Sequence, residues 1–301
     1  IYLIMKNILI IGCGLIGSSL LRAINDKKLT KKIYVYEKSK RNILKIKKLK
    51  LQCRITSNFK SIVPNLDLII LCTPLSEYEK IILEINKYLT PKTIITDVGS
   101  SKKKSSEIIK KKLKKGIFWT SSHPIAGSEV SGPEHGTKDL FLNKWCILIK
   151  EKETNHKHLA ALRKFWLKIG SKVSIMNSKK HDTVFSMTSH LPHLIAYNLV
   201  KTATDFEKQK KYELIKFSAG GLRDFSRIAA SNEIMWRDIF FDNKKNIVKT
   251  INLFIKNLVL FKKDIILNNK KSMIKKLIET KKIRKKIIRL KQDVDKPDFG
   301  R

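Results

Sequence analysis

His123 is the side chain of this sequence best suited to acid–base chemistry. It opens the segment 123–128, HPIAGS, directly after the apolar run 117–120. A histidine in a Pro- and Gly-containing loop at a strand end can exchange protons near neutral pH, because the ordinary pKa of imidazole is about 6.5. The alternative is a packing role. The polar segment 97–102, DVGSSK, follows another apolar run and brings Ser100 to the same predicted sheet edge.

Two arginines in the second half of the chain are candidates for binding an anion. Arg223 and Arg227 lie four residues apart, just after a Gly220-Gly221 pair. A guanidinium group can hold a carboxylate through two parallel hydrogen bonds. The alternative is an ion pair between subunits, with Asp224 or Asp238 as the acid, and we expect one arginine in each role.

The segment 189–193, SHLPH, places His190 and His193 three residues apart, where they could share one face of a helix. Such a pair can bind a metal ion, but no third Cys, Asp or Glu ligand stands at a convincing spacing. We therefore expect no metal site.

A glycine-rich loop near the N-terminus predicts dinucleotide binding. The apolar run 8–11 leads into Gly12-Cys13-Gly14-Leu15-Ile16-Gly17, a GxGxxG pattern between a predicted strand and a predicted helix. In such a loop the first glycine makes a tight turn, the second admits the pyrophosphate and the third packs the helix against the sheet. The free N–H groups at the helix start then bind phosphate.

Glu37 bears on which dinucleotide binds. It ends the apolar run 33–36, twenty residues after the last glycine of the loop. An acidic residue there accepts hydrogen bonds from the adenosine ribose and repels a 2′-phosphate, which favours NAD. Lys38, Lys40 and Arg41 follow directly and could hold a 2′-phosphate, so NADP stays open.

Short apolar runs alternate with amphipathic stretches through the first half of the chain. This alternation indicates a parallel sheet with helices on both faces, and the continuous apolar character of the runs agrees with burial on both sides. Ligands bind beyond the carboxyl ends of the strands in such sheets, which is where the polar segments fall. The predicted strands cover 8–11, 33–36, 66–71, 93–96, 117–120 and 145–149.

The pattern becomes helical in the second half. Residues 155–169 predict a helix ended by Gly170, a short strand follows at 173–175, and two Lys-rich amphipathic helices fill 243–290. We therefore predict an α/β Rossmann domain with a doubly wound parallel sheet over residues 1–153. An all-helical domain follows over 154–301, and its apolar stripes predict contact between subunits.

The net charge of +38 over 301 residues would suit binding to nucleic acid or a membrane surface. The basic residues are mostly lysines spread along the whole chain, without interleaved base-stacking aromatics, so we favour compositional bias and expect neither partner. No apolar run approaches the roughly 18 residues of a membrane span, and no signal peptide precedes the glycine loop. The four cysteines have no paired spacing, which fits a reducing cytoplasm.

Taken in order, these motifs resemble those of the prephenate/arogenate (cyclohexadienyl) dehydrogenase family. The matching motifs are GxGxxG, DxGSxK, HPIAGSE, SHLPH and GGLRDFSRIA, followed by SNEIMWRD at 231–238, and they span nearly the whole chain. The ending PDFGR at 297–301 resembles the broad-specificity cyclohexadienyl members. The resemblance implies a homodimer that oxidatively decarboxylates prephenate, arogenate or both, with hydride transfer to NAD(P), in tyrosine biosynthesis.

The same resemblance implies roles for individual residues. His123 is expected to accept the proton of the substrate's ring hydroxyl, while Ser100 holds this histidine and the hydroxyl. Arg227 is expected to bind the ring carboxylate. The other implied positions line the substrate side-chain pocket or lie along the cofactor, and they are His193, Ser189, Thr73 and Pro74.

Two other classes of protein compete with this interpretation. A β-hydroxyacid dehydrogenase would need a catalytic lysine after the second-domain glycines, whereas here Arg, Asp and Arg follow them. A dinucleotide sensor without activity, or a nucleic-acid-binding protein, would not need His123, Ser100 and Arg227 together.

Overall fold

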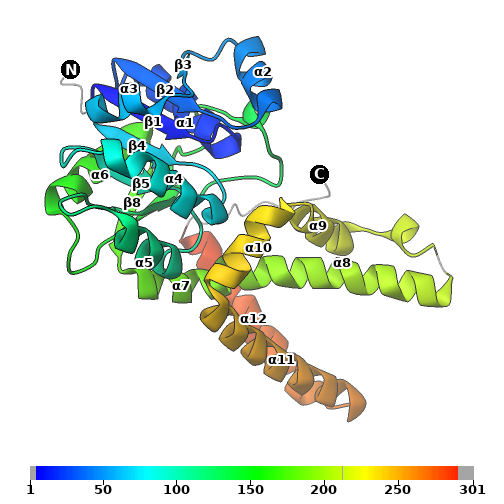
Figure 1. Cartoon of the computed structure of the whole chain (residues 1–301). Helices are drawn as coiled ribbons and strands as arrows, with labels where there is room; N and C mark the ends of the chain where they lie inside the picture. The colour runs from blue at the N-terminus through cyan, green and yellow to red at the C-terminus, as the bar shows by residue number, and fades with distance from the viewer. Residues whose placement is uncertain (1–4, 212, 291–301) are drawn as a thin grey trace.

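The first half of the chain folds around a five-stranded parallel sheet (Figure 1). The computed structural model describes residues 5–211 and 213–290. The strand order is β3-β2-β1-β4-β5, so the chain crosses from one side of β1 to the other between β3 and β4. This crossover makes the β1/β4 edge the expected ligand position. The strands are β1 (Asn7–Ile11), β2 (Lys32–Tyr36), β3 (Arg54–Ile55), β4 (Leu68–Leu71) and β5 (Ile94–Asp97).

Alternate side chains of β1 enter two separate cores, which explains why the run is apolar throughout. Ile8 and Ile10 pack in a cluster with helices α1 (Leu15–Asp26), α2 (Lys40–Lys48) and α6 (His156–Ile169). Leu9 and Ile11 pack in a second cluster with α4 (Tyr78–Ile85) and α5 (Lys103–Lys112). The predicted doubly wound sheet is therefore confirmed.

The strand predicted at 117–120 is wrong. Trp119 makes only an isolated bridge to Ile95, and the strand that forms is β6 (Ser122–Pro124). It pairs antiparallel with β7 (Trp145–Ile149), which pairs parallel with β8 (Lys172–Met176). Because residues 122–124 pair in register with Cys146–Leu148 of β7, His123 lies within an antiparallel strand and not in a loop beyond a parallel one.

Helix α6 and strand β8 follow the predicted domain boundary at 153/154. The helix begins at the Asn155 N-cap and ends at Gly170, whose φ of +102° is the left-handed conformation that favours glycine. Its Leu162 and Trp166 pack in the same core as β1, and β8 extends the small sheet. We therefore propose that the domains divide near Asn177, after β8.

The second half is helical from α7 onward. Its long α11 and α12 confirm the two predicted Lys-rich helices, and Figure 1 shows them side by side, projecting away from the sheet. No helix in the described residues is long and apolar enough to cross a membrane. The PDFGR ending lies outside the described residues. The main helices here are α7 (Ser178–Phe185), α8 (Leu191–Lys210), α9 (Gly220–Ala229), α10 (Glu233–Asp242), α11 (Lys244–Ile266) and α12 (Lys270–Arg289).

A π-helical turn, Ser186–His190, joins α7 to α8 without a break in the helical path. Pro192 stands in the first turn of α8 and has no N–H for the carbonyl of Thr188, so regular α-helical bonding cannot pass through this point. The wider turn sets the positions of Ser189, His190 and His193 relative to the sheet.

Candidate functional site

A cleft of about 970 Å³ lies between the carboxyl edge of the parallel sheet and helices α8, α9 and α10. It brings together parts of the chain that are more than 200 residues apart in sequence, from Gly12 to Ile239. Among the predicted site residues only Gly17 does not line it. Those that do are Gly12, Gly14, Leu15, Ile16, Glu37, Thr73, Pro74, Ser100, His123, Ser189, His193 and Arg227.

The glycine loop has the shape that a dinucleotide diphosphate requires. Gly12 has φ +90°, and a Cβ on it would lie 2.8 Å from the Cys72 carbonyl oxygen. A Cβ on Gly17 would lie 2.0 Å from the Gly12 oxygen, so only glycine lets α1 approach the loop. A Cβ on Gly14 would meet nothing within 4 Å, which leaves open space beside the free N–H groups of the first turn of α1.

Glu37 is held rigidly beside this loop. Its Oε2 accepts a hydrogen bond from the Cys13 N–H at 2.8 Å, and its Oε1 accepts one from the Ser39 N–H at 2.8 Å. Thr73, whose Cγ2 would lie 2.9 Å from a Cβ on Gly12, has a buried hydroxyl without a hydrogen-bond partner within the described residues. A fixed carboxylate, an unsatisfied buried hydroxyl and an open glycine loop all fit a bound dinucleotide.

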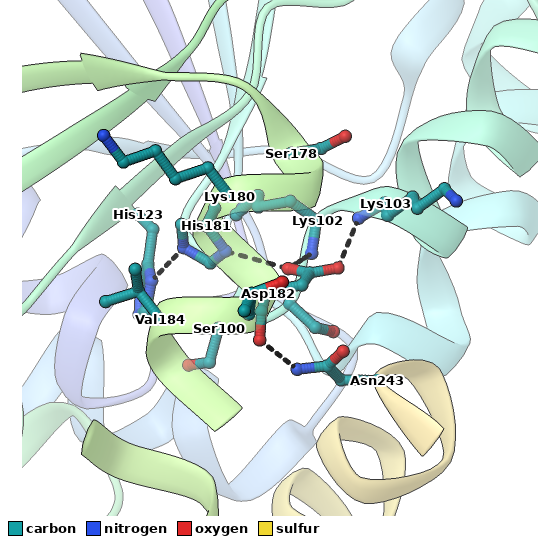
Figure 2. Close-up of polar contacts among 12 residues, drawn as sticks. Ser100, Lys102, Lys103, His123, Ser178, Lys180, His181, Asp182, Val184 and Asn243 are labelled. Carbon is teal, nitrogen blue, oxygen red and sulfur yellow. Dashed lines mark hydrogen bonds and ion pairs between the residues drawn. The ribbon is translucent and has the colours of Figure 1, made fainter. Parts of the chain in front are cut away.

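His123 is connected to a buried chain of polar groups (Figure 2). Its Nδ1 lies 2.8 Å from Nε2 of His181, and Nδ1 of His181 lies 2.8 Å from Oδ1 of Asp182. Asp182 also accepts hydrogen bonds from the backbone N–H groups of Lys102 and Lys103, both at 2.9 Å. The family resemblance gives the role of holding His123 to Ser100. In the structure, the residue that contacts Nδ1 of His123 is His181.

The DVGSSK segment has a structural function besides placing Ser100 on the cleft. Lys102 is fully buried, and its Nζ donates to Oδ2 of Asp97 at 2.5 Å and to the Ser122 carbonyl oxygen at 2.7 Å. Asp97 also accepts from the Ser121 hydroxyl at 2.5 Å. This buried ion pair fixes β6, and with it His123, against the end of β5.

The helical side of the cleft is formed by α8, α9 and α10. His193 Nδ1 lies 2.9 Å from the Ser189 carbonyl oxygen, and its ring stacks on Trp236 with centroids 3.8 Å apart. Arg227 points to the cleft from α9 and pairs with Glu129, with 3.5 Å between Nη1 and Oε2. The same cleft therefore contains His123, a cation and a flat aromatic ring.

Asp238, one of the two acids considered as a partner for an arginine across a subunit interface, makes its contacts within the chain. It pairs with Arg237 at 2.7 Å and accepts a hydrogen bond from the Ser76 N–H at 3.0 Å. This second contact ties α10 to the segment after β4, which also carries Thr73 and Pro74.

Burial keeps the cleft histidines neutral. It lowers the pKa of His123 well below its usual 6.5, and the neighbouring His181 and Lys102 lower it further. Burial also lowers the pKa of His190 to about 4, despite a contact with the Ser100 carbonyl, and lowers that of His193. The His193 ring stacks on Trp236 and the His190 ring meets Trp236 edge-on, and no cluster of metal-ligating side chains occurs among residues 5–211 and 213–290.

Several of these groups were not identified from the sequence. Glu129 stands inside the quoted HPIAGSE motif, so an acidic side chain six residues after His123, near the predicted sheet edge, was a usable signal. His181 and Asp182 carry no local signal, because the groups that they hold, His123 and the Lys102 N–H, lie 58 or more residues away in sequence. Trp236 belongs to the quoted SNEIMWRD segment, but nothing in its spacing predicts a stack on His193.

Comparison with known proteins identifies the family. The sequence model of the prephenate dehydrogenase nucleotide-binding domain matches residues 20–175, and that of the prephenate dehydrogenase dimerization domain matches residues 177–280. The chain belongs to the prephenate dehydrogenase family. The predicted family and enzyme class, a nicotinamide-dependent dehydrogenase of tyrosine biosynthesis, are thereby confirmed.

Individual family members resemble this prephenate dehydrogenase homologue over most of their length. The cyclohexadienyl dehydrogenase of Zymomonas mobilis is 33% identical over 255 residues, which cover 85% of this chain and 87% of that protein. The prephenate dehydrogenase of Bacillus subtilis is 31% identical over 253 residues, 83% of this chain and 68% of that protein.

Solved structures support the fold. The prephenate dehydrogenase from Aquifex aeolicus, in complex with hydroxyphenyl propionate and NAD+, superposes with a TM-score of 0.88 at 33% identity and covers 94% of this chain and 98% of its own. Synechocystis arogenate dehydrogenase superposes with a TM-score of 0.76 at 23% identity, covering 93% of this chain and 99% of its own, and shows the shared fold alone.

Proposed function

We propose that this protein oxidatively decarboxylates both prephenate and arogenate, uses NAD in preference to NADP, and works as a homodimer. The observation that carries the proposal is the placement of a neutral His123, with Nδ1 held by His181, in the same cleft as the cationic Arg227. The cyclohexadienyl dehydrogenase name of the Zymomonas relative supports dual use, and the NAD+ in the Aquifex structure supports the cofactor.

Each cleft residue has a task in this reaction. Arg227 binds the ring carboxylate, which orients the cyclohexadienol ring. Ser100 hydrogen-bonds the ring hydroxyl, and His123 accepts its proton. Ser189 and His193 line the pocket for the keto or amino side chain, and the stack of His193 on Trp236 keeps that wall rigid.

The chemistry needs few further groups from the protein. NAD, when bound beside the glycine loop, would supply the hydride acceptor. As the hydroxyl proton moves to Nε2 of His123, the carbon that bears the oxygen loses hydride and becomes a ketone. The ring carboxylate then leaves as carbon dioxide, its electron pair aromatises the ring, and the phenolate oxygen takes back the proton from His123. The residues of the cleft orient the ring and direct this proton.

Two features support a homodimer. The helical half matches a dimerization-domain model, and α11 and α12 expose a series of large apolar side chains among the residues that the structure describes. Exposed apolar stripes of this kind indicate contact between subunits. Light scattering of the purified chain should give twice the 34.8 kDa of one copy, and a mass of one copy would contradict this part of the proposal.

His123→Asn tests the proposed reaction. The change keeps a polar side chain but removes the base, so turnover should fall by about 10²–10⁴-fold. The KM for substrate should stay within about threefold, because the lost interaction belongs to the transition state. Turnover near that of the wild type would show that His123 is not the base.

A further inference from the structure

Each hydrogen bond behind His123 can be assigned a donor and an acceptor. Asp182 is buried, and its two oxygens together accept N–H bonds from Lys102, Lys103 and His181, as Figure 2 shows. A carboxylate that makes three such bonds can only accept. Nδ1 of His181 must therefore carry a proton and donate it to Asp182.

The same reasoning assigns the donor and the acceptor between His181 and His123. Burial lowers the pKa of His181 below 6.5, so its ring is neutral at pH 7 and carries a single proton, the one on Nδ1. Nε2 of His181 is then an acceptor, and the atom 2.8 Å away, Nδ1 of His123, must be its donor. A neutral His123 with its proton on Nδ1 has its lone pair on Nε2, the ring nitrogen left for the cleft.

We propose that His181 and Asp182 are positioning residues that set the tautomer of His123 and thereby make Nε2 the base. The inference deepens the function proposed above and rests on it, since it assigns His123 as the group that takes the hydroxyl proton. His181 and Asp182 themselves do not touch the substrate: neither lines the cleft.

The surroundings of the two rings leave them little freedom. His181 is fully buried and Asp182 nearly so, and both belong to the first turns of α7. The Phe185 ring packs against both histidines, with centroids 4.5 Å from His181 and 5.0 Å from His123. The Asp182 carbonyl also accepts a hydrogen bond from Asn243 at 2.7 Å, which joins α7 to the start of α11.

The imidazolium formed during turnover benefits from the same arrangement. Once Nε2 of His123 has taken the proton, Nδ1–H still donates to His181, and the negative charge of Asp182 lies one ring further on. An orienting carboxylate behind a catalytic histidine stabilises both its tautomer and its charged form. Here a second histidine extends this connection across two rings.

Two substitutions at one position separate hydrogen bonding from packing. His181→Phe keeps a ring against Phe185 but offers no acceptor, so kcat should fall about 10²–10³-fold with both KM values within about threefold. In His181→Gln the side-chain oxygen can accept from Nδ1 of His123, and kcat should stay within about tenfold of the wild type. His158→Phe is the matched control, a buried histidine outside the cleft, and should leave kcat unchanged.

A spectroscopic measurement on the full-length protein tests the tautomer without any assay. Histidine is labelled with 15N, and the His123 ring signals are assigned by their loss in His123→Asn. At pH 7 the wild type should show the proton on Nδ1, and His181→Phe should show it on Nε2 or exchanging between both. A wild-type proton on Nε2 overturns the proposal, as do equal losses of kcat in the Phe and Gln variants or a full kcat in the Phe variant.

These outcomes are distinct from failure of the proposed function. If His123→Asn stays active, the base itself is wrongly assigned. If His123→Asn is inactive and His181→Phe fully active, the base stands and only the positioning role fails.

Discussion

Replacing Arg227 by alanine should weaken substrate binding without slowing chemistry. A charge-assisted hydrogen bond to a carboxylate contributes about 1.5–3 kcal/mol. The Arg227 side chain is 58% exposed and already pairs with Glu129 at 3.5 Å, so the substrate replaces water and one carboxylate rather than filling a dry site. We therefore expect the low end, about 1.5–2 kcal/mol, which corresponds to roughly a 10–30-fold rise in KM.

The assay is steady-state formation of reduced nicotinamide with saturating NAD and varied prephenate. Arg227→Ala should raise the KM for prephenate as stated and leave kcat and the KM for NAD within about threefold. Arg237→Ala is the control, because Arg237 is similarly exposed but pairs with Asp238 and does not line the cleft. A fall in kcat with unchanged KM would refute the reasoning, since Arg227 would then act in the transition state rather than in orienting the ground state.

Three more outcomes follow from the cleft. The ratio kcat/KM should stay level as pH falls through 6.5, because burial lowers the pKa of His123 and the neutral ring is the base. A pH profile of kcat/KM with an inflection at or above 6.5 would contradict this. Gly17→Ala, whose Cβ would lie 2.0 Å from the Gly12 oxygen, should weaken NAD binding at least tenfold in a fluorescence titration, and tight binding would rule out the loop geometry. Glu37→Gln should shift the NAD/NADP ratio of kcat/KM about tenfold toward NADP, since it removes a fixed negative charge beside the loop; an unchanged ratio would show that Glu37 does not select the cofactor.

The parts of the fold predicted from sequence are those encoded by local patterns. The apolar run of β1, the glycine spacing after it, and the Asn155 and Gly170 ends of α6 are each determined by nearby residues. The strand predicted at 117–120 is wrong although Ile117 to Thr120 is as apolar as a strand. The pairing partner of the edge strand β6 is β7, some 25 residues further along the chain, so local apolar character does not show where the strand begins.

The site divides in the same way. His123, Ser100 and Arg227 belong to motifs with recognisable spacing, and all three line one cleft. The groups behind His123 could not be predicted, because a buried His–His–Asp chain depends on α7 packing against β6 and the start of α5. No periodicity in the sequence specifies that packing, and His181 by itself is indistinguishable from any other buried histidine.

The most direct test of the proposed function is a grid of four reactions with the purified full-length protein: prephenate or arogenate, each with NAD or NADP, followed by the absorbance of reduced nicotinamide. We expect turnover of both substrates with NAD and weaker turnover with NADP. Absence of signal in all four reactions, from protein shown to be folded and dimeric, would contradict the proposed function and leave only the family and the fold established.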